Sequence, residues 1–118
     1  MKRILFIFRN PPYGNSTSSE GLDLLLGASV FEFELSLAFI DDGVFQIKYN
    51  QQTDPLGLKN FSAILAALPH YGIEHIYVEQ ESLQKRGLLQ TDLIIETKLI
   101  SAALLSDQII SSDFVFHF

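Results

Sequence analysis

The feature that most constrains the fold is a repeated alternation of short apolar runs with helical patterns. Residues 3–8 form a continuous aliphatic and aromatic run, which is typical of a strand that is covered on both faces in a parallel sheet. Further strand-like runs occupy residues 35–40, 76–78, 93–96 and 114–118. Strands that alternate with helices predict crossover connections and a parallel sheet between two helical layers.

Helical patterns occupy the intervals between these strands. A loop rich in Pro, Gly, Ser and Thr spans residues 9–19, after which Ser18 or Ser19 is expected to cap a helix that runs to about residue 31. This helix is apolar almost all round, which predicts that it is covered on two sides. Further helices are expected after Pro55 and up to residue 68, at residues 82–86 before Gly87, and at residues 101–106 or slightly beyond. We therefore expect one domain over residues 1–118, an α/β sandwich of flavodoxin-like type with a five-stranded, mainly parallel sheet and helices on both faces.

The composition restricts the class of protein. Hydrophobic residues make up 47% of the chain and charged residues 19%, yet the apolar runs are far shorter than the roughly 18 residues of a membrane span. The short run after Lys2 and Arg3 is too brief for a signal peptide, so we expect a cytoplasmic protein without a membrane segment. A net charge of −6 and the absence of a basic cluster argue against direct nucleic-acid binding.

Ligand sites of open parallel sheets lie beyond the carboxyl ends of the strands, and two loops there carry polar residues. Gly14, Asn15, Ser16 and Thr17 precede a helix and offer amides and hydroxyls for an anion. A flavodoxin-like protein would hold a nucleotide phosphate with such a loop, so nucleotide or anion binding is an alternative function. Pro11 and Pro12 remove donors from this loop, and a capped polar loop is the simpler interpretation.

The second loop contains Asp41, Asp42 and Gly43, which follow the strand-like run at residues 35–40. Adjacent carboxylates point in alternate directions on an extended backbone and make a poor shared metal site. We interpret this loop as a turn that one aspartate caps and in which Gly43 supplies an unusual backbone angle.

No motif of a catalytic or metal site is found elsewhere. The three histidines, His70, His75 and His117, have no helical ligand spacing and no cysteine to complete a zinc set. No strained Gly-x-Ser-x-Gly elbow of a hydrolase is present. We therefore expect no metal, no cofactor and no enzyme activity of the chain's own.

One stretch is more specific than the rest: Phe39, Ile40, Asp41, Asp42, Gly43, Val44, Phe45 and Gln46. With the Tyr71-Gly72 and Arg86-Gly87-Leu88 elements and the closing run at residues 113–118, it resembles the DsrE/DsrF-like family of sulfur-relay proteins, most closely the TusC/DsrF branch. The sulfur carriers of that family hold sulfur as a cysteine persulfide at the end of the third strand. The matching positions here, Tyr77, Val78 and Glu79, contain no thiol, and the 118 residues include no cysteine.

The resemblance implies a non-catalytic subunit of a sulfur-relay complex. Its expected partners are TusB-like and TusD-like subunits in a heterohexamer built as a dimer of trimers, and indirectly a TusE-like carrier, in 2-thiolation of the wobble uridine of tRNA. A DsrF-like subunit of a sulfur-oxidation DsrEFH complex is an alternative. The 41–46 loop is then expected to contact a partner, and the chain alone to form a homo-oligomer, because its apolar surface exceeds what one small core needs.

Overall fold

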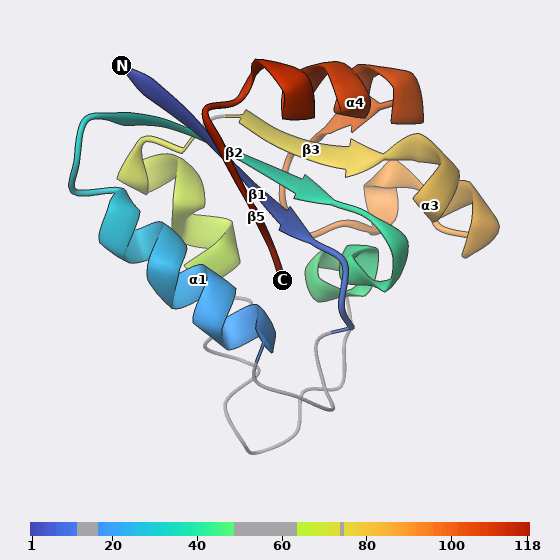
Figure 1. Ribbon diagram of the computed structural model, residues 1–118. Coiled ribbons are helices and arrows are strands. Elements are labelled where there is room, and N and C mark those ends of the chain that lie inside the picture. Colours follow the sequence, from blue (N-terminus) through green and yellow to red (C-terminus); the bar gives the residue numbers. More distant parts are fainter. Residues whose placement is uncertain (12–16, 49–63, 74) are drawn as a thin grey trace.

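A computed structural model describes residues 1–11, 17–48, 64–73 and 75–118 (Figure 1). The strands are β1 (Lys2–Phe8), β2 (Phe33–Phe39), β3 (His75–Glu79), β4 (Lys98–Ile100) and β5 (Phe114–His117). The α-helices are α1 (Thr17–Ala28), α3 (Gln80–Lys85) and α4 (Ala102–Ser111), and 3-10 turns occupy η1 (Asp41–Ile47), η2 (Leu68–Tyr71) and η3 (Gln90–Asp92). Residues 64–67 are helical and lead directly into η2.

The five strands form one parallel sheet in the order β4-β3-β2-β1-β5. Each strand from β2 to β4 is therefore added on the same side of β1, and β5 pairs with the other side of β1. A flavodoxin, by comparison, has the order 2-1-3-4-5. Because β1 lies between β2 and β5, its residues Leu5, Phe6, Ile7 and Phe8 are fully buried.

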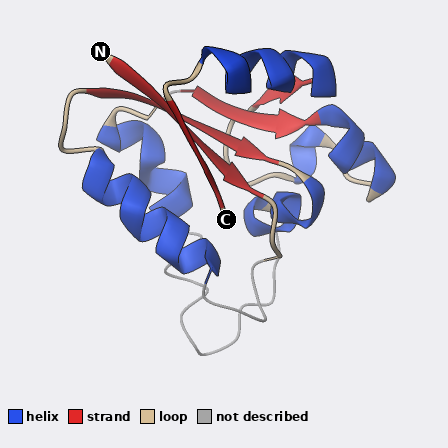
Figure 2. Cartoon of the chain, viewed as in Figure 1, coloured by secondary structure: helices blue, strands red, loops and turns tan. Residues whose placement is uncertain are grey.

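Side chains of β1 alternate between two apolar cores, one on each face of the sheet. Ile4, Phe6 and Phe8 join the larger core, which contains Leu22 and Leu25 of α1. Leu5 and Ile7 join the smaller core beneath α4, together with Leu105 and Ile100. Figure 2 shows α1 and α4 on opposite sides of the strands. The predicted α/β sandwich with helices on both faces and five parallel strands is thus confirmed.

Two glycines end their helices as the sequence predicts. Gly72 follows η2 and Gly87 follows α3, and each has a positive φ, 79° and 66° respectively. L-residues with a side chain rarely adopt this left-handed conformation, whereas glycine does so without a steric penalty.

The predicted bounds of the fourth strand and of the first helix are wrong. The fourth strand was expected at residues 93–96 but begins at Lys98; Leu93 instead forms an antiparallel bridge with Lys48. As an edge strand, β4 buries only Ile100 of its three residues, so its sequence lacks a strong apolar signal. The first helix was expected to start after Ser18 or Ser19 and run to about residue 31, but it begins at Thr17 and ends at Ala28.

Within the described part of the chain, α1 is covered on the side that faces the sheet. Leu22 and Leu25 are buried against the sheet, whereas Leu24 is 45% exposed and Phe31, just beyond the helix, is 63% exposed. Of the residues described, none belongs to a helix long and apolar enough to cross a membrane.

Candidate functional site

The carboxyl ends of β1, β2 and β3 meet at one edge of the sheet, and the 41–46 loop lies there as most of η1 (Figure 1). η1 directly follows β2, and α3 directly follows β3, so the two elements are neighbours and contact each other. This edge is where parallel α/β proteins place their ligands and reacting groups.

Gly43 packs against the backbone at the end of β1. A Cβ atom at this position would lie 1.9 Å from the carbonyl oxygen of Phe8 and 2.6 Å from its carbonyl carbon. The same oxygen accepts a hydrogen bond from the amide of Ile40 at 3.0 Å. The close approach, and not an unusual backbone angle, is therefore the reason for glycine here.

The predicted role of the aspartates as turn caps is likewise corrected. The residue with positive φ in this loop is Asp41, at 51°, and Gly43 is not in that region. The residue that precedes η1, Ile40, caps it without a side-chain hydrogen bond. Aspartate tolerates the left-handed conformation better than most L-residues, which explains Asp41 at this position.

The second half of the loop is part of the core. Val44, Gln46 and Ile47 have no exposed surface. The Gln46 side chain donates a hydrogen bond from Nε2 to the carbonyl oxygen of Asn10 at 2.7 Å. This bond ties the loop after β2 to the chain that leaves β1.

A buried serine connects the loop to the end of β3. Ser82 is only 2% exposed, and its hydroxyl accepts a hydrogen bond from the Asp41 amide at 2.9 Å. The same hydroxyl donates to Oε1 of Glu79 at 2.5 Å. Both hydrogen-bonding functions of the hydroxyl are used inside the protein, so Ser82 acts here as a structural link.

An ion pair reinforces this connection on the surface. The Arg86 guanidinium contacts Oδ1 of Asp42 through Nε at 3.1 Å and through Nη2 at 3.0 Å, and its Nη1 donates to the Ser82 carbonyl at 3.2 Å. The Asp42 side chain is 56% exposed and that of Arg86 21%. An exposed pair of this kind contributes little stability, typically about 0–1 kcal/mol.

The three positions at the end of β3 have different environments. Val78 is buried in the larger core, and Tyr77 is half-buried beside the smaller one. Glu79 is half-buried and is oriented by Ser82. The three residues that stand where the sulfur carriers have their cysteine therefore end in a hydrogen-bonded carboxylate, that of Glu79.

The candidate anion loop falls largely outside the described residues. Gly14, Asn15 and Ser16 are not among the described residues, whereas Thr17 is described and is the first residue of α1. The proposal that these four residues bind an anion stays a prediction.

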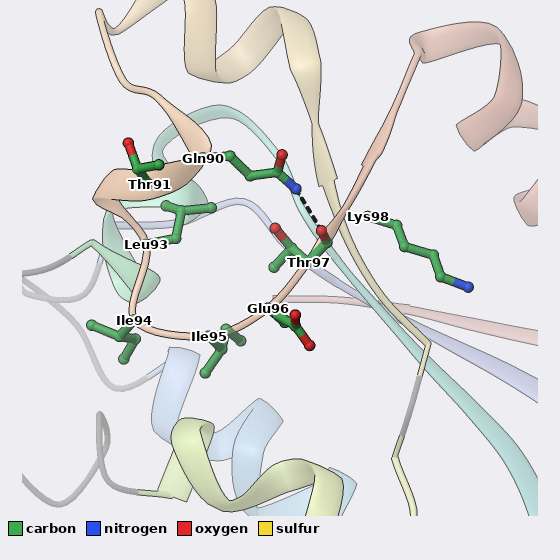
Figure 3. A pocket seen from close by; sticks show the side chains of 8 residues that line it. All are labelled: Gln90, Thr91, Leu93, Ile94, Ile95, Glu96, Thr97 and Lys98. Atoms are coloured by element: carbon green, nitrogen blue, oxygen red, sulfur yellow. Dashed lines mark hydrogen bonds between the residues drawn. The ribbon is translucent and has the colours of Figure 1, made fainter.

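A shallow hollow of about 750 Å³ lies along the segment that leads into β4 (Figure 3). Gln90 Nε2 donates to the Thr97 carbonyl oxygen across it at 2.5 Å. The lining residues are Gln90, Thr91, Leu93, Ile94, Ile95, Glu96, Thr97 and Lys98. None of these carries a strong nucleophile, and no group of three or more potential metal ligands gathers anywhere in the described ranges.

Sequence reasoning found the 41–46 loop but missed the residues that hold it. Ser82 was noticed only within a short helix, Arg86 only there and in the Arg86-Gly87-Leu88 element, and Asn10 only within the loop at residues 9–19. A signal existed in the spacing, because Glu79, Ser82 and Arg86 recur at intervals of three and four residues and so lie on one side of α3. The partners of Ser82 and Arg86 are Asp41 and Asp42, which lie 41 and 44 residues earlier in the chain. These pairings follow only from the strand order.

Comparison with known proteins identifies relatives over the full length. The model of the DsrE/DsrF-like family matches residues 2–118. The protein TusC of Buchnera aphidicola is 38% identical over 119 residues, covering 100% of both chains. The intracellular sulfur oxidation protein DsrF of Allochromatium vinosum is 34% identical over 132 residues, covering 100% of this chain and 97% of its own.

A solved structure agrees at the level of the fold. The ychN protein from E. coli superposes with a TM-score of 0.81 at 20% identity, with 100% of each chain covered. The family model over residues 2–118 and the relatives of 34–38% identity over the full chain lead to one assignment. The chain belongs to the DsrE/DsrF-like family.

Proposed function

We propose that this chain is a non-catalytic subunit of a cytoplasmic sulfur-relay complex of the TusBCD type, which supports 2-thiolation of the wobble uridine in tRNA. In this proposal it assembles with TusB-like and TusD-like subunits into a heterohexamer, and its partner's cysteine carries the sulfur toward a TusE-like protein. The relatives named TusC and DsrF support a role in sulfur metabolism.

The observation that carries the proposal is the absence of a thiol from the 118 residues. A persulfide forms only on a thiolate, and Met1 is the single sulfur-containing residue. At the end of β3, the Glu79 carboxylate accepts a hydrogen bond from Ser82. This chain therefore contributes shape and contacts to the relay, and the covalent step belongs to another subunit.

The 41–46 loop supplies these contacts through its exposed first residues. Asp41 and Asp42 are exposed, whereas Gly43, Val44 and Gln46 are buried. The buried half fixes the loop against β1, and the links to Ser82 and Arg86 fix it against α3. A partner subunit that places its cysteine beside this edge would thus meet a rigid acidic surface.

A second candidate function is that of a DsrF-like subunit in a sulfur-oxidation complex. Identity of 34% to DsrF over the full chain favours this possibility almost as well as identity of 38% to TusC favours the first. A flavodoxin-like role in nucleotide or anion binding at Gly14–Thr17 is the third. A yellow preparation that retains flavin would favour the third candidate over the other two.

The test is deletion of the gene in its own host. Hydrolysed tRNA is analysed for 2-thiouridine at the wobble position by mass spectrometry, with pseudouridine as an internal control that needs no sulfur. We expect loss of 2-thiouridine, with recovery on complementation. Unchanged 2-thiouridine together with impaired growth on reduced sulfur compounds would contradict the thiolation role and favour the DsrF-like one.

A further inference from the structure

The aromatic residues of β5 all face the α1 side of the sheet. Phe116 lies 5.6 Å from Phe6 between ring centroids, and Phe118 lies 6.2 Å from Phe6 and 5.6 Å from Phe8. Phe114 is two residues before Phe116 in the same strand and so faces the same side. β5 and the residue that follows it, Phe118, therefore present a row of three phenylalanines beside α1.

Helix α1 and strand β5 meet at one end of this row and leave a groove at the other. At the carboxyl end of β5, the Phe118 ring packs so closely on Gly21 that an added Cβ would lie 2.5 Å from it. Toward the amino ends of the strands there is an apolar hollow of about 460 Å³. Leu24 and Gly27 of α1 form one wall, Phe116 the other, Phe6 and Phe33 line it between them, and Phe31 also borders it. We call this the α1–β5 groove.

The groove and the neighbouring Phe114 expose apolar surface to solvent. Leu24 is 45% exposed, Phe31 63%, Phe114 52% and Phe116 39%. A fully exposed phenylalanine side chain has an area of about 150–250 Å², so the exposed parts of these four residues together amount to on the order of 400 Å². The largest apolar patch of a monomer is typically about 300–600 Å² and is often functional, and a standard interface takes about 800 Å² from each partner.

The layer geometry indicates what fits there. Neighbouring strands are about 4.8 Å apart and a helix is about 10 Å across, so one helix covers about two strands. On this face α1 lies beside β5 (Figure 1), and in the described part of the chain no second helix covers the outer side of that edge strand. The occupant that completes the layer is one helix with an apolar face, docked as a helix in a groove.

Charge indicates whether the helix that occupies the groove comes from a second copy of this chain or from a different chain. Asp23 is the one charged residue among those that line the groove. The exposed apolar helix that a second copy could offer, α4, carries Asp107 and no basic residue, and each copy adds a net charge of −6. Like charges across an interface oppose association.

We propose that the α1–β5 groove binds an amphipathic helix of a different subunit, one that brings a lysine or arginine to Asp23. The inference rests on the proposed function, since the partner is another subunit of the same relay complex. It adds the surface that makes the contact and the chemistry that the partner's helix must present.

Matched leucines test the proposal. Leu24→Gln removes apolar surface from the groove, and Leu104→Gln does the same on α4, where Leu104 is 55% exposed on the opposite face. The probe is the pair of DsrE/DsrF-like subunits from the same host, co-purified with this chain and titrated by sedimentation. We expect Leu24→Gln to weaken the complex by about tenfold or more and Leu104→Gln by less than about twofold.

Asp23→Lys and Asp107→Lys repeat the comparison for charge. In the wild-type complex, hydrogen exchange should show more protection from exchange in α1 and β5 than in α4. A complex that forms normally with all four variants would overturn the groove proposal while the proposed function stands. Self-association through the groove that persists when the partner subunits are present would overturn the choice of partner. If the wild-type chain forms no complex with these subunits, the proposed function fails and the groove proposal fails with it.

Discussion

Replacement of Gly43 by alanine is the sharpest test of how the 41–46 loop is held. The added Cβ would lie 1.9 Å from the Phe8 carbonyl oxygen, where Cβ atoms essentially never come within 3.0 Å. The atoms that it meets are backbone, so either the loop or the end of β1 must move by about 1 Å, the difference between these two distances. Because both are backbone segments, neither the loop nor the end of β1 can make room by rotating a side chain.

The expected loss of stability follows from what this movement breaks. Overpacking in a closed site typically costs about 1–3 kcal/mol. The hydrogen bonds from Ile40 to Phe8 and from Gly43 to Ile40, at 3.0 and 2.9 Å, are both strained by the shift, and a hydrogen bond contributes about 1 kcal/mol. We expect a decrease of about 3–5 kcal/mol in the free energy of unfolding, a large part of the roughly 5–15 kcal/mol of a small domain.

The assay is chemical denaturation followed by circular dichroism, with thermal unfolding as a second measure. Gly27→Ala is the matched control, because no atom other than those of its chain neighbours and of the backbone of α1 lies within 4 Å of its Cβ position. This control should keep or gain stability by up to about 1 kcal/mol, since alanine favours a helix. If Gly43→Ala unfolds within about 0.5 kcal/mol of the wild type, the account of the close approach is wrong.

Three further predictions concern the links around the loop and the state of the chain. Gln46→Leu should lower the free energy of unfolding by about 1–3 kcal/mol, because the Asn10 carbonyl loses its donor; the exposed Gln84→Leu is the control, and equal effects would refute the role of the buried amide. Asp42→Ala should change stability by less than about 1 kcal/mol but weaken assembly or sulfur handover in the complex, and full assembly with full relay would show that the loop has no such role. At micromolar concentration the isolated chain should sediment as a homo-oligomer, and a clean 13.3 kDa species that partner subunits do not change would contradict this.

The architecture could be predicted because its signals are local. Buried central strands such as β1 are continuous apolar runs, and Gly72 and Gly87 mark helix ends at which the backbone needs a positive φ. An edge strand buries few residues, so β4 left a weak signal and was placed five residues too early. The order of the strands, with β5 beside β1, depends on contacts between distant segments and was not predicted.

The place of the 41–46 loop at the carboxyl edge of the sheet was predicted from the sequence, but the contacts that hold the loop were not. The 41–46 loop was identified from its residue pattern, yet the reason for Gly43 is a contact with Phe8, 35 residues earlier. Ser82 gave no signal of its own, since a serine in a short helix is common; only its burial between Asp41 and Glu79 reveals its role. Long-range hydrogen bonds of this kind do not follow from local sequence.

The claim that this chain supports sulfur transfer without carrying sulfur is tested most directly by intact mass spectrometry. The chain and its cysteine-bearing partner are incubated together with a cysteine desulfurase and cysteine, then separated without reductant. The account predicts a gain of about 32 Da, one sulfur atom held by a thiolate, on the partner and none on this chain. A stable gain of that mass on this chain would contradict the account.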